Sequence, residues 1–151
     1  MSKLRIRSLE LKDIPAIENI FDKYWSGYFR SHLSDKLKLM DMNWIVAEQD
    51  DEIVGVAASR EAPEQMRLYS KNENVMEFYV VAVKYQGQGI GTTLRDERVE
   101  QATKAGYKEM VFFSGETHKD SWIFHDDSEF KRVGEHVAPD GERGFIWSMQ
   151  L

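Results

Sequence analysis

The sequence predicts a mixed α and β fold, and three observations support this. About seven short β-rich runs alternate with runs of helical periodicity. A glycine-rich turn at residues 86–92 stands directly between an apolar, β-branched run and a helix-like run. The chain has 151 residues, of which 42% are hydrophobic, so we expect one domain, residues 1–151, with a substantial core.

The first half of the chain is predicted to form strands over residues 4–9, 43–48 and 52–59, and helices over residues 14–24 and 34–40. Alternation of apolar and polar residues indicates the first strand. Asp13 is expected to cap the first helix, which has Pro15 in its first turn. The other two β-rich runs are separated by a polar turn, which predicts an antiparallel hairpin. Gly55 is expected to mark a bulge there.

The second half is predicted to form strands over residues 75–83, 108–114, 130–137 and 144–149, and helices over residues 89–105 and 121–127. Residues 60–74 are polar and without a clear period, which indicates a long connection. The strand after them carries few polar residues, so we expect it to be buried on both faces for much of its length. Gly106 is placed to end the longer helix, and residues 138–142 form a strong turn signal between the last two strands.

Composition excludes several classes of function. The net charge is −6 and no long basic block occurs, so we expect neither nucleic acid nor a membrane as a partner. An acidic surface favours cationic small substrates such as amines. The chain has no cysteine, which excludes thiolate metal sites and a cysteine nucleophile. No apolar segment suits a signal peptide or a bilayer span, so we expect a cytoplasmic protein.

The glycine-rich turn is the strongest candidate for a binding site. Glycines at 87, 89 and 91 let successive backbone N–H groups face one point, and the following helix adds the donors of its first turn. Such a turn binds phosphate groups. A dinucleotide fingerprint would need glycine where Thr92 stands, and the Gly-Lys-Ser/Thr ending of a Walker A loop is absent.

The remaining pattern, Gln86-x-x-Gly89-x-Gly91, resembles the pyrophosphate loop of the GNAT superfamily of acetyl-CoA-dependent N-acetyltransferases. The preceding residues 80–85 are similar to the central strand of that family, although Val83 stands where proline is frequent. Further likeness covers residues 4–7, 13–17 and 130–135, so the resemblance spans almost the whole chain.

The resemblance implies a fold and a cofactor site. The fold would be a GNAT-like domain with a central mixed and partly splayed sheet of about seven strands and helices on both faces. The acetyl donor would be acetyl-CoA, with backbone groups near Val81 and Val83 bonding its pantetheine arm. The pyrophosphate would be held by Gln86, Gly87, Gln88, Gly89, Ile90, Gly91 and Thr92. His118 stands where family members often carry an asparagine that bonds the same arm.

The catalytic residues are expected from chemistry and from position. Amide formation from a thioester needs a neutral amine, a stabilised oxyanion and a proton for the leaving thiolate. Glu77 shares a strand face with Val81 and is the expected base, with Glu73 as the alternative. For the proton, the family commonly uses a tyrosine five residues before a phenylalanine. Here that count from Phe130 reaches His125, although Glu129 replaces the usual glycine. A histidine can donate near neutral pH, but a structural role for His125 is equally open.

Two readings of function stay open at this point. The first is an N-acetyltransferase that moves an acetyl group to a primary amine of a small molecule or peptide, through a ternary complex. The second is a non-catalytic acyl-CoA-binding module, and a nicotinamide oxidoreductase is disfavoured. A zinc site from His118, His125 and the adjacent aspartates lacks the usual ligand spacing, so no metal is expected. The amine acceptor is not identified by the sequence, and a homodimer stays open.

Overall fold

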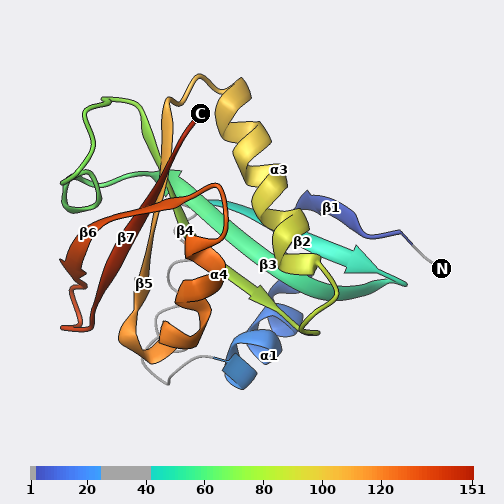
Figure 1. Ribbon diagram of the computed structural model, residues 1–151. Coiled ribbons are helices and arrows are strands. Elements are labelled where there is room, and N and C mark those ends of the chain that lie inside the picture. The colour runs from blue at the N-terminus through green and yellow to red at the C-terminus, as the bar shows by residue number, and fades with distance from the viewer. Residues whose placement is uncertain (1–2, 25–41) are drawn as a thin grey trace. The chain divides into compact units, whose positions relative to one another are not determined.

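A computed structural model describes residues 3–24 and 42–151 (Figure 1). The helix expected over residues 34–40 lies outside these described residues. The described chain divides into two compact units. The first comprises Met1–Arg60 and Val80–Arg98, and the second comprises Glu61–Tyr79 and Val99–Leu151. Strand β4 (Val75–Val83) and helix α3 (Ile90–Lys104) contribute residues to both units.

The strands form a seven-stranded mixed sheet in the order β1-β2-β3-β4-β5-β7-β6. Their remaining bounds are β1 Arg5–Ser8, β2 Asn43–Gln49, β3 Glu52–Glu61, β5 Glu109–Gly115, β6 Lys131–Val137 and β7 Arg143–Gln150. The described helices besides α3 are α1, Ile14–Tyr24, and α4, Trp122–Asp126. β4 and β5 are parallel, whereas β1–β2, β2–β3, β5–β7 and β6–β7 are antiparallel. The predicted mixed α and β fold is therefore confirmed.

The parallel pairing between β4 and β5 is short. Residues 75–77 pair with residues 109–111, whereas β5 pairs with β7 along its whole length, from Glu109 to Gly115. A ladder limited to the start of β4 agrees with the partly splayed sheet that the family resemblance implies.

In the first unit, the hairpin of β2 and β3 forms as predicted. Asp50 and Asp51 make its turn with φ values of 54° and 62°, the left-handed conformation that two-residue hairpin turns require. Ala47 pairs with Gly55 while the next residue, Glu48, pairs with Ile53. One residue of β3 is therefore extra, and the expected bulge lies beside Gly55.

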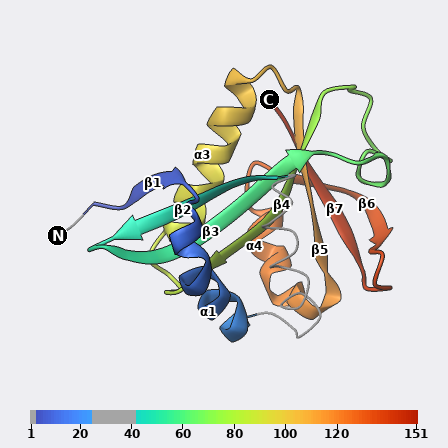
Figure 2. The ribbon, with the colours of Figure 1, turned by 180° about the vertical axis from the view of Figure 1, so that it is seen from behind.

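Two helices cover this hairpin. A Cβ atom at Gly55 would lie 2.8 Å from the Ile90 side chain and 2.9 Å from that of Leu94, so α3 packs directly against β3. Figures 1 and 2 view the chain from opposite sides: α3 lies in front of β3 in Figure 1, and α1 lies toward the viewer in Figure 2. Helices on both faces of the sheet were expected.

The predicted cap of α1 is wrong. Asp13 belongs to a short 3-10 turn, Leu11–Asp13, and its carboxylate accepts a hydrogen bond of 2.8 Å from the Glu10 N–H. The same carboxylate accepts bonds of 2.8 and 2.9 Å from Arg7, which also donates to Glu48 at 2.9 Å. The guanidinium hydrogen bonds hold the pKa of the buried Asp13 below its usual value. The carboxylate is therefore committed to β1 and to the turn before α1, rather than to α1.

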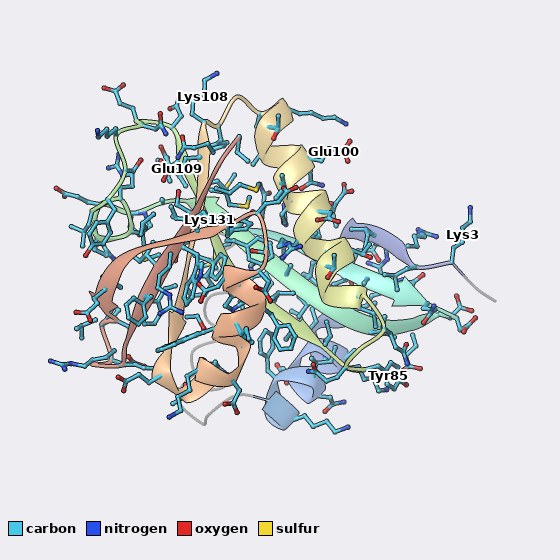
Figure 3. All side chains as sticks on the ribbon, in the orientation of Figure 1. Lys3, Tyr85, Glu100, Lys108, Glu109 and Lys131 are labelled. Carbon is cyan, nitrogen blue, oxygen red and sulfur yellow. The ribbon has the colours of Figure 1, made fainter. Side chains whose placement is uncertain are left out.

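In the second unit, hydrogen bonds tie the long connection to the sheet. The Ala62 N–H donates to the Val75 carbonyl, and the Tyr69 hydroxyl donates to the Glu135 carbonyl, both at 2.9 Å. Glu109, labelled in Figure 3 at the start of β5, accepts hydrogen bonds from Ser70, Asn72 and Ser148. Burial alone would raise the pKa of Glu109, but these donors hold it below its usual value. The buried carboxylate thus anchors residues 61–74. Within the described residues, every helix is too short or too polar to span a bilayer.

Candidate functional site

The glycine turn is open, and two of its glycines have left-handed backbone conformations. Gly87 and Gly89 have φ values of 76° and 77°, and a Cβ atom at either position would meet nothing within 4 Å. The first bond of α3 runs from the Thr93 N–H to the Gly89 carbonyl at 3.0 Å, so earlier amides have no acceptor within the helix. Residues 86–89 are exposed, whereas Ile90 is buried and fixes the start of the helix. The turn presents open backbone donors at a positive helix end, which suits a phosphate group.

The side chains before the turn form their own ionic group. Lys84 pairs with Glu52, and the Tyr85 hydroxyl donates to the same carboxylate at 2.9 Å. The hydrogen bond to Glu52 raises the pKa of Lys84 above its usual value. Figure 3 labels Tyr85 between β4 and α3. Because Glu52 balances the Lys84 charge, the positive character of the turn comes mainly from backbone amides and the helix dipole. Sequence analysis missed this pair, since the two residues are distant in the chain.

Val81 and Val83 lie on the last part of β4, beside the turn. The buried-strand prediction holds for residues 75–78, but Val81 is 37% exposed and Val83 is half-buried. A Cβ at Gly91 would lie 3.7 Å from the Val83 side chain, so the strand end and the helix start are in contact. These valines are only partly packed into the core.

Glu77 lies on the first part of β4, in the second unit, with its Cα paired to that of Val111. Only 5% of its surface is exposed, whereas Glu73, the alternative base, is exposed. The two predicted bases therefore differ in burial, Glu77 lying inside the strand and Glu73 at the surface before it.

His125 lies on α4 and is half-buried among aromatic rings. Its ring centroid is 4.7 Å from that of Phe112 on β5 and 5.1 Å from that of Trp147 on β7, both in edge-to-face contact. Its Nε2 atom is 3.3 Å from the Ser121 hydroxyl oxygen. The imidazole therefore combines apolar packing with a polar contact, and both predicted roles remain compatible with its position.

The residue after His125 fastens α4 to the sheet. The Asp126 carboxylate accepts hydrogen bonds from Trp147 Nε1 at 2.9 Å and from Arg132 at 2.7 Å. These bonds, the Trp147 bond first, hold the pKa of Asp126 below its usual value. The Arg132 guanidinium carbon also lies 4.4 Å from the centre of the Phe145 ring. Sequence analysis missed these partners because they come from β6 and β7 and leave no local spacing signal.

His118 is exposed and lies in the 3-10 segment Glu116–Ser121, at a kink where its φ and ψ are −117° and 25°. Its carbonyl accepts a 2.7 Å hydrogen bond from the Ser121 hydroxyl. Among the described residues, no group of three or more histidine or acidic side chains could hold a metal ion.

The structure brings the predicted residues together in two sets. Val81, Val83 and the glycine turn belong to the first unit, whereas Glu77, His118 and His125 belong to the second.

Comparison with known proteins identifies the family. The sequence profile of the acetyltransferase (GNAT) family matches residues 14–130, which is more than half of the chain. No curated protein is significantly similar in sequence.

Solved structures share the fold at low sequence identity. An N-acetyltransferase from Staphylococcus aureus Mu50 is 17% identical, with a TM-score of 0.73 and 99% of each chain covered. The PaiA N-acetyltransferase from Thermoplasma acidophilum, solved in complex with coenzyme A, is 16% identical with a TM-score of 0.70 and the same coverage. The ribosomal-protein-S18-alanine N-acetyltransferase from Escherichia coli is 17% identical, with a TM-score of 0.73, over 98% of this chain and 94% of that chain. Since the family profile covers most of the sequence and the fold agrees, this chain belongs to the GNAT family of acetyltransferases.

Proposed function

We propose that this protein is an acetyl-CoA-dependent N-acetyltransferase that moves an acetyl group to a primary amine of a small molecule or peptide. The observation that carries this proposal is the open glycine turn at the start of α3, where Gly87 and Gly89 expose their backbone to a phosphate-sized ligand. Bound coenzyme A in the Thermoplasma acidophilum neighbour supports the choice of cofactor. The substrate named for the Escherichia coli neighbour supports including peptide amines among the acceptors.

The proposed reaction is direct transfer in a ternary complex, and each of its needs is assigned to a residue. The backbone N–H near Val81 would stabilise the oxyanion that develops on the thioester carbonyl. Glu77 would take the proton of the incoming ammonium, directly or through water. His125 would supply a proton to the leaving thiolate. This is the role that a tyrosine commonly has in the GNAT family. The amides of residues 86–92 would hold the pyrophosphate of acetyl-CoA.

The test follows thiol release from acetyl-CoA with a disulfide dye, across a panel of small amines and short peptides. The protein has no cysteine, so it contributes no background thiol. Glu77→Gln keeps the size of the side chain but removes the base, and it is expected to lower turnover by about a hundredfold or more. The loss should be greatest at low pH, where the amine is protonated. His125→Phe should also lower turnover, with acetyl-CoA affinity unchanged in both variants.

A non-catalytic acyl-CoA-binding module is the second candidate. The observation in its favour is the contact of the His125 ring with Phe112 and Trp147, which gives that residue a structural role. This candidate predicts that acetyl-CoA binds but that no amine in the panel is acetylated. Wild-type turnover in both variants would contradict the assigned residues while leaving the transferase activity intact. Absence of acetyl-CoA binding would refute both candidates.

A further inference from the structure

Ser121 is the last residue of the 3-10 segment Glu116–Ser121, which continues directly into α4. Its backbone is helical, with φ and ψ of −89° and −8°, and its side chain makes no capping hydrogen bond. Instead, its hydroxyl donates to the His118 carbonyl at 2.7 Å and lies 3.3 Å from Nε2 of His125. The residues are four apart, so both side chains share one face of the helix.

The hydroxyl has a single proton, which decides the direction of the second bond. Because that proton is donated to the His118 carbonyl, the Ser121 oxygen can only accept from His125. The contact with Nε2 is then a hydrogen bond in which Nε2 carries the proton.

We propose that Ser121 is a positioning residue that keeps Nε2 of His125 protonated, so that Nδ1 is the nitrogen that gains and loses a proton. The catalytic meaning of this inference rests on the proposed function, but the hydrogen bond itself does not. It identifies which nitrogen of His125 exchanges its proton, in a histidine that the family resemblance implies takes the place of a tyrosine.

Neighbouring groups keep the ring in this orientation. Phe112 and Trp147 hold the imidazole by edge contacts from β5 and β7. Charged groups near it include Asp126 on its own helix, which bonds Arg132 of β6 at 2.7 Å and also accepts from Trp147. The contact of the Ser121 hydroxyl with Nε2 is the one from which the proton on Nε2 is inferred.

Each proton of the transfer then has a named donor and acceptor. The ammonium first gives one proton to Glu77, which passes it to water. The neutral amine nitrogen then bonds to the thioester carbon as the carbon–sulfur bond breaks, and the second proton of that nitrogen goes to Glu77. The leaving thiolate takes the proton from Nδ1 of the His125 imidazolium. The ring remains neutral afterwards, with its proton on Nε2 and its bond to Ser121 unbroken.

The experiment is a ¹H–¹⁵N correlation spectrum of the imidazole groups in protein labelled at histidine nitrogen, recorded above neutral pH. The chain has four histidines, and the signal set that disappears in His125→Phe is thereby assigned to His125. Wild type should show His125 protonated at Nε2, with that proton protected from exchange with water. Ser121→Ala should lose this protection, whereas Ser121→Thr, which retains a hydroxyl, should keep it.

Ser128→Ala is the matched control. The Ser128 hydroxyl donates to the backbone carbonyl of His125 at 2.6 Å and does not bond the ring, so the protected Nε2 proton should persist. A wild-type spectrum with the proton on Nδ1 would overturn the inference without any variant. Equal loss of protection in Ser121→Ala and Ser128→Ala would overturn it too, because the effect would then be general loosening of α4.

Kinetics separate this inference from the proposed function. With any accepted amine, Ser121→Ala should lower kcat about tenfold and leave KM for acetyl-CoA unchanged, while Ser121→Thr restores kcat. A protected Nε2 proton in a protein without turnover supports the inference and refutes the transferase activity. Turnover in a protein whose His125 is protonated at Nδ1 supports the activity and refutes the inference.

Discussion

Replacing Gly89 by aspartate is expected to abolish acetyl-CoA binding while the protein stays folded. Gly89 has a φ of 77°, and nothing lies within 4 Å of an added Cβ atom, so the new side chain meets no protein atom. That open space is where the pyrophosphate is proposed to lie. The variant places a carboxylate there, which repels the phosphates and fills the cradle.

The cost to stability is limited and can be matched elsewhere. A non-glycine residue in the left-handed region costs about 1–2 kcal/mol. Gly106, at the far end of α3, has a φ of 92° and equally open surroundings, so Gly106→Asp carries the same backbone cost. Its carboxylate would also oppose the negative end of the helix dipole, which makes this control at least as destabilising. For a chain of this length, each kcal/mol lowers Tm by about 2–4 °C.

The assay is thermal unfolding with and without acetyl-CoA, supported by calorimetric titration. At about a hundred times its Kd, the ligand should stabilise wild type by about 2.7 kcal/mol, or about 5–11 °C in Tm. Gly106→Asp should show the same shift from a lower starting Tm, and Gly89→Asp should show none. A folded Gly89→Asp protein that keeps wild-type affinity would refute the placement of the pyrophosphate. Loss of binding in both variants would attribute the effect to stability instead.

Two further predictions concern buried carboxylates. Asp13 has a lowered pKa in the folded state, so its stabilising effect is present at neutral pH and is lost as pH falls below about 4. Asp13→Asn should lower the free energy of unfolding in urea by about 2–4 kcal/mol at pH 7, because Arg7 loses its bidentate partner and keeps only Glu48 and the exposed Glu10. Glu10→Gln, at a 57% exposed side chain, should cost under about 0.5 kcal/mol. Equal costs would contradict the assignment of the ion pair to Asp13. Glu109→Gln should speed hydrogen exchange in residues 61–74, because an amide offers one oxygen where donors now reach two, and unchanged exchange there would contradict the anchoring role.

The glycine turn was predictable because everything that defines it is local. Gly87 and Gly89 take positive φ values in a turn that directly joins a strand to a helix, so the backbone conformation of the turn can be predicted from consecutive residues. Asp13 shows the opposite case. Its position before Pro15 is typical of a cap, but Arg7 approaches it from β1 and its carboxylate is used there instead. A local capping pattern cannot include a partner that only folding brings near.

The position of His125 combines both cases. The count back from Phe130 assumes a fixed turn between helix and strand, and the Ser128 hydroxyl makes that turn by donating to the His125 carbonyl and accepting from the Phe130 N–H at 3.1 Å. His125 and Phe130 both pack on the ring of Phe112. The centroid of that ring lies 4.7 Å from the centroid of the His125 ring and 5.0 Å from that of Phe130. Any planar ring at position 125 would meet Phe112 in this way, which gives a physical reason why an imidazole fits at this position. The contact between the Ser121 hydroxyl and His125 could not be predicted from residue spacing, because it depends on which ring atom, Nε2, faces the hydroxyl.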